Sequence, residues 1–154
     1  MQRLLATMFT TTTYGTWLPG DVRGYVDEGR VLPGDAVVLR KARRAMAMRP
    51  VLLTVAEQDA AFESLVRACE EFSIDLLAAS VESWHLHCLV NHRAESAAKT
   101  IARLKNRVRQ RLDRGRIWTA GYDKRFCFDE DTVRNRRAYI ARHAGCRPVP
   151  MRTR

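Results

Sequence analysis

Apolar residues recur every three or four positions in two long segments of the chain, which is the pattern of amphipathic helices. In the segment 55–72 the recurring residues are Ala61, Phe62, Leu65, Val66, Cys69 and Phe72. Thr54 precedes this segment and Glu57 follows three residues later, so the pair predicts an N-cap with a capping box. In the segment 94–114 the recurring residues are Ala98, Ile101, Leu104, Val108 and Leu112, and Gly115 is a candidate C-cap.

Four shorter apolar runs have the length and composition of β-strands. They cover residues 4–14, 74–82, 84–91 and 122–128. The second and third runs are separated by about one polar residue, which predicts a tight hairpin around Glu82 and Ser83.

The remaining segments are marked by turn and helix-end residues. Gly, Pro and Asp in residues 15–34 predict a loop, and the helix-like segment 35–48 has to end before Pro50. The segment 129–144 begins with acidic residues and is followed by Gly145, which predicts a third helix.

The order of these elements is strand, helix, strand, strand, helix, strand and a further helix. It predicts an α+β fold: a ferredoxin-like antiparallel sheet with helices on one face, plus a C-terminal helix that carries Tyr139. The length of 154 residues corresponds to one domain, 1–154. Such a sheet leaves its other face free for chemistry or binding.

Two histidines stand one residue apart in the segment WHLHCLVNH. Side chains alternate along a strand, so His85 and His87 project to one face while Leu86 and Cys88 project to the other. Two imidazoles on one face are placed to bind a divalent ion, although each could instead face solvent or a neighbouring strand. His92 lies on the opposite face by parity, and we interpret it as a solvated loop residue.

A third ligand is needed, because two are too few for a tight site. His143 lies four residues after Tyr139 in the last predicted helix, so the two side chains share one helix face. If that face covers the free side of the sheet, the tyrosine hydroxyl and the third imidazole reach the histidine pair. The alternative for Tyr139 is a place in the core or on the surface.

The net positive charge of the chain indicates a polyanionic binding partner, with nucleic acid as the leading candidate. The chain has 27 Lys and Arg residues against 17 Asp and Glu, a formal net charge of +10, although part of the excess can reflect a compositional preference for Arg. The predicted helix 94–114 concentrates the cations, and we expect phosphate contacts from Lys99, Arg103, Lys105, Arg107, Arg109 and Arg111. Trp118 and Tyr122 could stack on unpaired bases or could anchor the core.

Together these residues resemble the single-tyrosine HUH transposases, in particular the small transposase-like proteins associated with repetitive extragenic palindromes. HUH denotes His, a hydrophobic residue and His, here 85–87, and the segment YGTWLPGDVRG, 14–24, is similar to one found in a branch of that group. In the family a catalytic tyrosine precedes a metal-binding Asn or Gln by four residues. Tyr139 and His143 occupy those positions, so the third ligand is a histidine here or a neighbour on the same helix.

The resemblance implies a metal-dependent endonuclease that cuts single-stranded, hairpin-containing DNA. Tyr139 would form a covalent 5′-phosphotyrosine, and His85, His87 and His143 would bind Mg²⁺ or Mn²⁺, with three imidazoles favouring Mn²⁺. It also implies a homodimer, because several members of the family share or exchange their tyrosine helices.

Two other functional classes remain to be compared. A non-catalytic nucleic-acid-binding domain would need neither the histidine pair nor Tyr139. A histidine-triad nucleotide enzyme would need a histidine at the position of Leu89, so we discount it. Four widely spaced cysteines without a CxxC pair, together with the lack of a signal-peptide or membrane-span pattern, predict a cytoplasmic, nucleoid-associated protein with no membrane partner.

Overall fold

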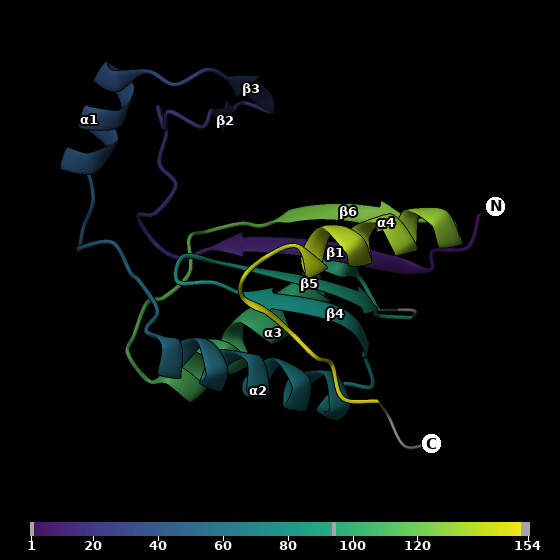
Figure 1. Cartoon of the computed structure of the whole chain (residues 1–154). Helices are drawn as coiled ribbons and strands as arrows, with labels where there is room; N and C mark the ends of the chain where they lie inside the picture. The colour runs from purple at the N-terminus through teal and green to yellow at the C-terminus, as the bar shows by residue number, and fades with distance from the viewer. Residues whose placement is uncertain (1, 94, 152–154) are drawn as a thin grey trace.

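A five-stranded antiparallel sheet forms the centre of the molecule (Figure 1). The computed structural model describes residues 2–93 and 95–151. The strands are β1 (Ala6–Thr12), β4 (Asp75–Val81), β5 (His85–Asn91), β6 (Asp123–Cys127) and β7 (Cys146–Arg147), in the order β6-β1-β5-β4-β7. The first four strands and the two helices between them have the β-α-β-β-α-β connectivity of ferredoxin-like folds. The predicted α+β class and antiparallel sheet are therefore confirmed.

Helices α2 (Val55–Glu71) and α3 (Ala97–Leu112) cover one face of this sheet (Figure 1). The predicted capping box of α2 is present: Glu57 N donates to Thr54 Oγ1 over 3.2 Å, and Thr54 N donates to Glu57 Oε2 over 2.9 Å. The main core lies between these helices and the sheet and includes Phe9, Leu65, Leu86, Cys88, Val90, Ile101 and Leu104. The apolar periodicity thus predicted the inner faces of both helices.

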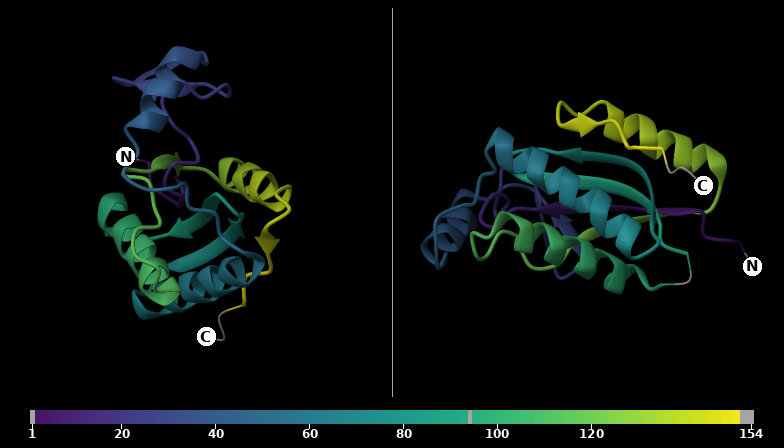
Figure 2. Two further views of the ribbon diagram at one scale, coloured as in Figure 1. Left: turned by 90° about the vertical axis from the view of Figure 1, so that its left-hand side faces the viewer. Right: turned by 90° about the horizontal axis from the view of Figure 1, so that it is seen from below.

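Helix α4 (Glu130–Ala141) crosses the opposite face of the sheet (Figures 1 and 2). A smaller core joins α4 to the strands; it contains Ala6, Met8, Leu89 and Cys127 from the sheet and Val133 and Ile140 from the helix. The sheet face that the sequence predicted to be free is therefore covered by α4 at one end only.

Residues 15–50 leave the end of β1 and form an arm beyond the sheet (Figure 1). The arm contains strands β2 (Tyr25–Asp27) and β3 (Arg30–Leu32) and helix α1 (Ala36–Arg44), which buries no residue. The β2–β3 hairpin corrects the predicted loop 15–34. Glu28 and Gly29 both have positive φ angles, 44° and 76°, as the two central residues of a type I′ turn do.

Several predicted boundaries were also wrong by a few residues. Helix α1 ends at Arg44 rather than at 48, and α4 ends at Ala141 rather than at 144. Helix α3 closes at Asp113, whose φ of 47° is left-handed, so the predicted C-cap at Gly115 was wrong. Strand β7 was not predicted, because two residues are too few to show a pattern.

Across the described ranges 2–93 and 95–151, no helix combines the length and the apolar character that crossing a membrane requires.

Candidate functional site

The histidine pair lies on the central strand of the sheet and faces α4. In the register of β5 with β1, His87 is opposite Thr10 and His85 is opposite Thr12, while Leu86 points into the core on the other face. Both imidazoles are buried, with 6% of His85 and 4% of His87 exposed. The predicted alternation along this strand is confirmed, and backbone pairing on both sides of β5 fixes the position of the pair.

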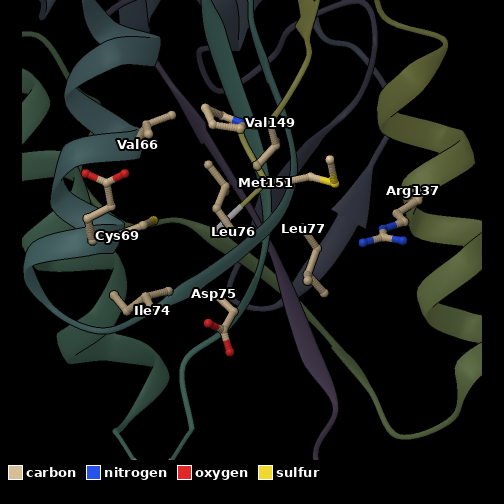
Figure 3. A pocket seen from close by; sticks show the side chains of 11 residues that line it. Val66, Cys69, Ile74, Asp75, Leu76, Leu77, Arg137, Val149 and Met151 are labelled. Carbon is tan, nitrogen blue, oxygen red and sulfur yellow. The ribbon is translucent and has the colours of Figure 1, made fainter. Parts of the chain in front are cut away.

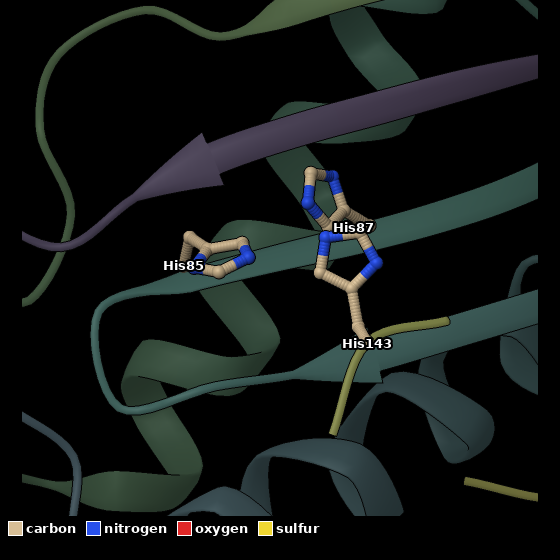
Figure 4. Close-up of side chains that lie close together, drawn as sticks. All are labelled: His85, His87 and His143. Carbon is tan, nitrogen blue, oxygen red and sulfur yellow. The ribbon is translucent and has the colours of Figure 1, made fainter. Parts of the chain in front are cut away.

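His143 joins the pair from the turn that follows α4 (Figure 4). Its ring centroid lies 4.5 Å from that of His87 and 5.6 Å from that of His85, and the His85 and His87 centroids are 4.7 Å apart. One ligand atom from each of the three residues can be chosen so that all lie within 4.8 Å of one another. His143 stands 58 positions after His85 in the sequence, and the fold brings its ring together with those of the histidine pair.

Hydrogen bonds at the Nδ1 atoms orient two of these rings. His87 Nδ1 lies 2.7 Å from Thr10 Oγ1, and His143 Nδ1 lies 3.0 Å from the carbonyl oxygen of Tyr139. A backbone carbonyl can only accept, so His143 Nδ1 carries its proton and Nε2 keeps its lone pair. Metal-binding histidines are commonly held in this way, with the second nitrogen on a carbonyl or hydroxyl group.

The unpaired ring nitrogen of His85 is the strongest sign that the cluster suits a metal ion. Its Nδ1 is buried and has no hydrogen-bond partner among the described residues. Nearly all buried polar atoms in proteins are satisfied, so an orphaned imidazole nitrogen beside two further imidazoles fits a metal ligand. The chemistry of the donor set agrees, because three imidazole nitrogens suit Mn²⁺ or a later first-row ion better than Mg²⁺.

The environment also keeps the pair in the neutral form that binds metal. Burial, together with His143 and Arg23, lowers the pKa of His85 to about 4. Burial, together with His85 and His143, lowers the pKa of His87 to about 3. At neutral pH both rings therefore offer a lone pair rather than a charge.

Tyr139 lies beside the three imidazoles on the last turn of α4. Its ring centroid is 5.5 Å from that of His87 and 4.9 Å from that of His143, and 39% of the residue is exposed. Ile140, the next residue, is fully buried and fixes the helix against the sheet. The helix therefore presents a solvent-accessible phenol next to the candidate metal ligands.

A cavity of about 1030 Å³ opens over the three imidazoles and Tyr139. Three arginines line it, Arg23 from the arm, Arg125 from β6 and Arg136 from α4, against the single carboxylate of Asp123. Trp17, Trp84 and Tyr122 add aromatic surface. A space of this size with a positive, partly aromatic wall suits a nucleotide and its phosphates.

The predicted phosphate-binding residues of α3 lie on the other side of the sheet from this cavity (Figure 1). Three of them form ion pairs within the chain: Lys99 and Arg103 with Glu95, and Arg107 with Glu71. Lys105 donates to the carbonyls of Thr119 and Gly121, whereas Arg109 and Arg111 are exposed. The structure thus separates most of this cationic run from the three imidazoles.

Lys105 and Arg109 nevertheless approach the site around the β6 edge. They line a second hollow of about 380 Å³ together with Trp118, Gly121 and Tyr122. Gly121 and Tyr122 also line the cavity over the imidazoles, so the two hollows are neighbours.

The structure places Trp118, Tyr122 and His92 in different environments. Trp118 is a core residue whose Nε1 donates to the carbonyl of Lys105, whereas Tyr122 is 36% exposed at the cavity wall. His92 is buried and hydrogen-bonded to Thr7 Oγ1 at 2.9 Å, so our interpretation of a solvated loop residue was wrong. Its exclusion from the candidate metal site is consistent with this position.

Another hollow, of about 290 Å³, lies between α2, β4 and the C-terminal segment (Figure 3). Apolar residues such as Val66 and Met151 line it together with the charged residues Glu70, Asp75 and Arg137, and its described lining residues are all different from those of the cavity over the imidazoles. We assign no function to it.

Sequence reasoning missed the contributions of Thr10 and of the arm. Thr10 binds the ring of His87, and cross-strand partners cannot be read without the register. Arg23 lies in the segment 14–24 that carried the resemblance, but no periodicity places a loop residue against a strand 60 positions away.

Comparisons with known proteins support the fold of this site. No protein-family model and no curated protein matches the sequence. A solved structure of a REP-associated tyrosine transposase bound to a REP hairpin superimposes with a TM-score of 0.57 at 10% identity, over 91% of this chain and 66% of that one. A candidate transposase from Deinococcus radiodurans R1 aligns over 92% of both chains at 14% identity and a TM-score of 0.49. The chain spans about two thirds of the hairpin-bound transposase and shares its fold.

Proposed function

We propose that the protein is a metal-dependent single-stranded DNA endonuclease and strand transferase, a transposase of the HUH type. The observation that carries this proposal is the convergence of His85, His87 and His143 with the exposed phenol of Tyr139 at one arginine-lined cavity. A non-catalytic DNA-binding domain would need a basic surface but no buried triple-imidazole cluster beside a tyrosine. The shared fold with a hairpin-bound tyrosine transposase agrees with the proposal.

Tyr139 is the proposed nucleophile. Its hydroxyl oxygen attacks the scissile phosphorus and loses its proton; the tyrosyl O–P bond forms, the bond from phosphorus to the 3′-oxygen breaks, and the 3′-oxygen takes up a proton. The products are a 5′-phosphotyrosine and a free 3′-hydroxyl. Since one phosphodiester is exchanged for another, a second 3′-hydroxyl can reverse the step and join a new DNA end.

His85, His87 and His143 would hold the divalent ion, Mn²⁺ or Mg²⁺. When bound, the ion polarises the phosphate and stabilises charge on the leaving oxygen. The rings themselves are held in place by Thr10 and by the Tyr139 carbonyl. Because His143 follows the end of α4 and its Nδ1 is hydrogen-bonded to the Tyr139 carbonyl, positioning the third imidazole also positions the nucleophile.

The arginines of the cavity, Arg23, Arg125 and Arg136, would bind phosphates around the scissile position. We propose that the DNA continues past Tyr122 to Lys105, Arg109 and Arg111 of α3. Lys99, Arg103 and Arg107 contribute less, because they lie across the sheet from the cavity and are paired there with Glu95 and Glu71. We further propose that residues 1–154 act as one domain and that the active form is a homodimer on hairpin DNA at the nucleoid.

A covalent-adduct assay tests the proposal. The protein is incubated with 5′- and 3′-labelled hairpin oligonucleotides carrying single-stranded flanks and Mn²⁺, and products are separated under denaturing conditions. We expect a protein–DNA adduct that contains the strand 3′ to the cut, loss of the adduct in Tyr139→Phe, and retention in Tyr122→Phe, a matched change at the same cavity. Absence of an adduct with all hairpins and both metals would contradict the proposal and favour the non-catalytic binder.

A further inference from the structure

The arm formed by residues 15–50 reaches the three imidazoles through a stack of aromatic and cationic side chains. The guanidinium Cζ of Arg23 lies 4.2 Å from the ring centroid of Trp17 and 4.8 Å from that of Trp84. Trp84 in turn lies 3.9 Å from His85, centroid to centroid. A continuous row of rings therefore leads from the candidate metal site to the arm.

The stack is fixed by hydrogen bonds that leave part of Trp17 exposed. Trp17 Nε1 donates to the carbonyl of Gly24 over 2.7 Å, and 37% of the residue is exposed. Arg23 Nε and Nη2 each donate to a carboxylate oxygen of Asp21 over 2.7 Å, and Nη2 also donates to the carbonyl of Thr16. Both planar groups are held in position before any ligand arrives, which lowers the entropic cost of binding.

Beyond Trp17 lies a groove of about 350 Å³ that the proposed catalytic step does not use. Its lining is largely apolar and includes Leu18, Pro19, Tyr25, Val26 and Val31. Val26 and Val31 face each other across the β2–β3 hairpin and are 66% and 82% exposed, which is high for apolar side chains paired on a strand. Thr12, Trp17 and Arg23 line both this groove and the cavity over the imidazoles, so the two spaces are continuous.

We propose that this groove binds an unpaired nucleobase of the DNA strand next to the scissile phosphate. The base stacks on Trp17 between Pro19 and the β2–β3 hairpin, and Arg23 binds the phosphate that connects it to the nucleotide at the metal site. The observations fit this ligand: the groove is largely apolar and contains aromatic rings, Arg23 is the one charged residue among the described residues that line it, and it opens into the arginine-lined cavity. The inference rests on the proposed function for the identity of the neighbouring nucleotide, but the base-binding groove can be tested without cleavage.

The test measures binding of a fluorescein-labelled ten-nucleotide oligothymidine to the full chain in EDTA, by fluorescence anisotropy. We expect Trp17→Ala to weaken the Kd roughly 5- to 100-fold, or about 1–3 kcal/mol, with an unchanged salt dependence. Trp17→Phe, which keeps an aromatic ring, restores most of the affinity. Asp21→Asn/Arg23→Gln, which removes both charges of the pair, reduces the slope of log K against log salt by about 0.7, the contribution of one phosphate contact on a single strand.

A second pair of variants separates binding from folding of the arm. Val31→Glu places a carboxylate in the groove at a side chain that is 82% exposed, whereas Val22→Glu makes the same change at one that is 88% exposed and does not line the groove. We expect Val31→Glu to weaken binding at least fivefold more than Val22→Glu, with equal melting temperatures. Equal affinities for the two glutamate variants, or for Trp17→Ala and the unchanged protein, would overturn the proposal.

The covalent-adduct assay distinguishes this inference from the proposed function. If the oligothymidine affinity depends on Trp17 and Val31 but no adduct forms, the base-binding proposal is supported and the nuclease proposal is contradicted. If the adduct forms but substitutions at Trp17 and Val31 leave the oligothymidine affinity unchanged, the nuclease proposal is supported and the base-binding proposal is contradicted.

Discussion

The Nδ1 atom of His143 lies 3.0 Å from the backbone carbonyl oxygen of Tyr139. One hydrogen bond thus connects the third imidazole to the residue that presents the proposed nucleophile. It also selects the tautomer of His143 and leaves Nε2 directed away from the helix end, where a metal ion can use it.

We expect His143→Ala to lower the affinity for Mn²⁺ at least tenfold, because it removes one of three protein ligands. Isothermal titration calorimetry on the metal-free protein measures this directly. Arg142→Ala, a change at the exposed neighbouring residue, serves as the control and leaves the affinity unaltered. An unchanged affinity in His143→Ala would remove this residue from the site.

The protonation of the histidine pair gives a prediction for the metal-free protein. Burial is the main cause that lowers the pKa of His85 to about 4 and that of His87 to about 3, while an unfolded chain has histidine pKa values near 6.5. We expect imidazole nitrogen chemical shifts, assigned with single His→Gln variants, to remain those of neutral rings at both positions down to about pH 5. A midpoint near 6.5 for either ring in the folded protein would contradict the burial that the structure shows.

The same shifts make folding stability depend on pH in a defined direction. The unfolded chain takes up protons at these two positions as the pH falls through about 6.5, whereas the folded chain does so only near pH 4 at His85 and near pH 3 at His87. Their contribution to the free energy of unfolding is therefore complete above pH 6.5 and is lost progressively between about pH 6.5 and pH 3. Urea denaturation of the metal-free protein across this range, compared with His85→Gln/His87→Gln, measures the difference in slope.

An arginine of the cavity and an arginine of α3 should differ in their effect on DNA binding. Arg136 lines the cavity over the imidazoles, whereas Arg107 is paired with Glu71 on the opposite side of the sheet. We expect Arg136→Gln to reduce the slope of log K against log salt by about 0.7 for a single-stranded oligonucleotide, as for one lost phosphate contact. Arg107→Gln should leave the slope nearly unchanged; the reverse result would place the backbone contacts on α3.

Gly145 is required by a close approach of two backbone segments. A Cβ at this position would collide with the carbonyl group of Val81, and Gly145 N donates to Glu82 Oε1 over 2.6 Å. We expect Gly145→Ala to push β7 away from β4, to destabilise the protein by about 1–3 kcal/mol and to weaken Mn²⁺ binding through displacement of His143. Urea denaturation and calorimetry measure the two effects, and an unchanged free energy of unfolding would contradict the close approach of the two backbone segments.

The sequence predicted the structure correctly where apolar or polar side chains repeat with the period of a helix or a strand. The spacing of Leu65 and Ile101 predicted the inner faces of two helices, and the alternation at His85 and His87 predicted which side chains leave the core. The i, i+4 spacing of Tyr139 and His143 predicted a shared position, although α4 ends at Ala141 and His143 reaches the site from the following turn. The i, i+4 spacing still predicted that Tyr139 and His143 lie together, because the turn after α4 continues in the direction of the helix.

The sequence was uninformative where contacts depend on tertiary placement. The excess of cations between residues 99 and 111 predicted one DNA surface, but Glu71 and Glu95 neutralise part of it. The pair of Lys99 with Glu95 has the local i, i+4 spacing, whereas the pairs of Arg103 with Glu95 and of Arg107 with Glu71 do not. Arg23, by contrast, stands in a loop without periodicity and still reaches Trp84 across the site. Ion pairs between separate elements and contacts of loops arise from the assembled fold, so no local pattern predicts them.

His85 and His87 lie on the central strand β5, whereas His143 follows helix α4, and these two elements are attached to the rest of the molecule to different extents. Strand β5 is hydrogen-bonded on both edges at the centre of the sheet, so its amides exchange with solvent only when the whole domain opens. Helix α4 is attached through Val133, Ile140 and a two-residue strand, so we expect it to open at a lower free energy than β5. The lifetime of the complete three-imidazole site is therefore set by local detachment of α4 rather than by global unfolding. Each such opening withdraws the third imidazole and Tyr139 together, so the site disassembles as one kinetic unit and leaves the histidine pair behind.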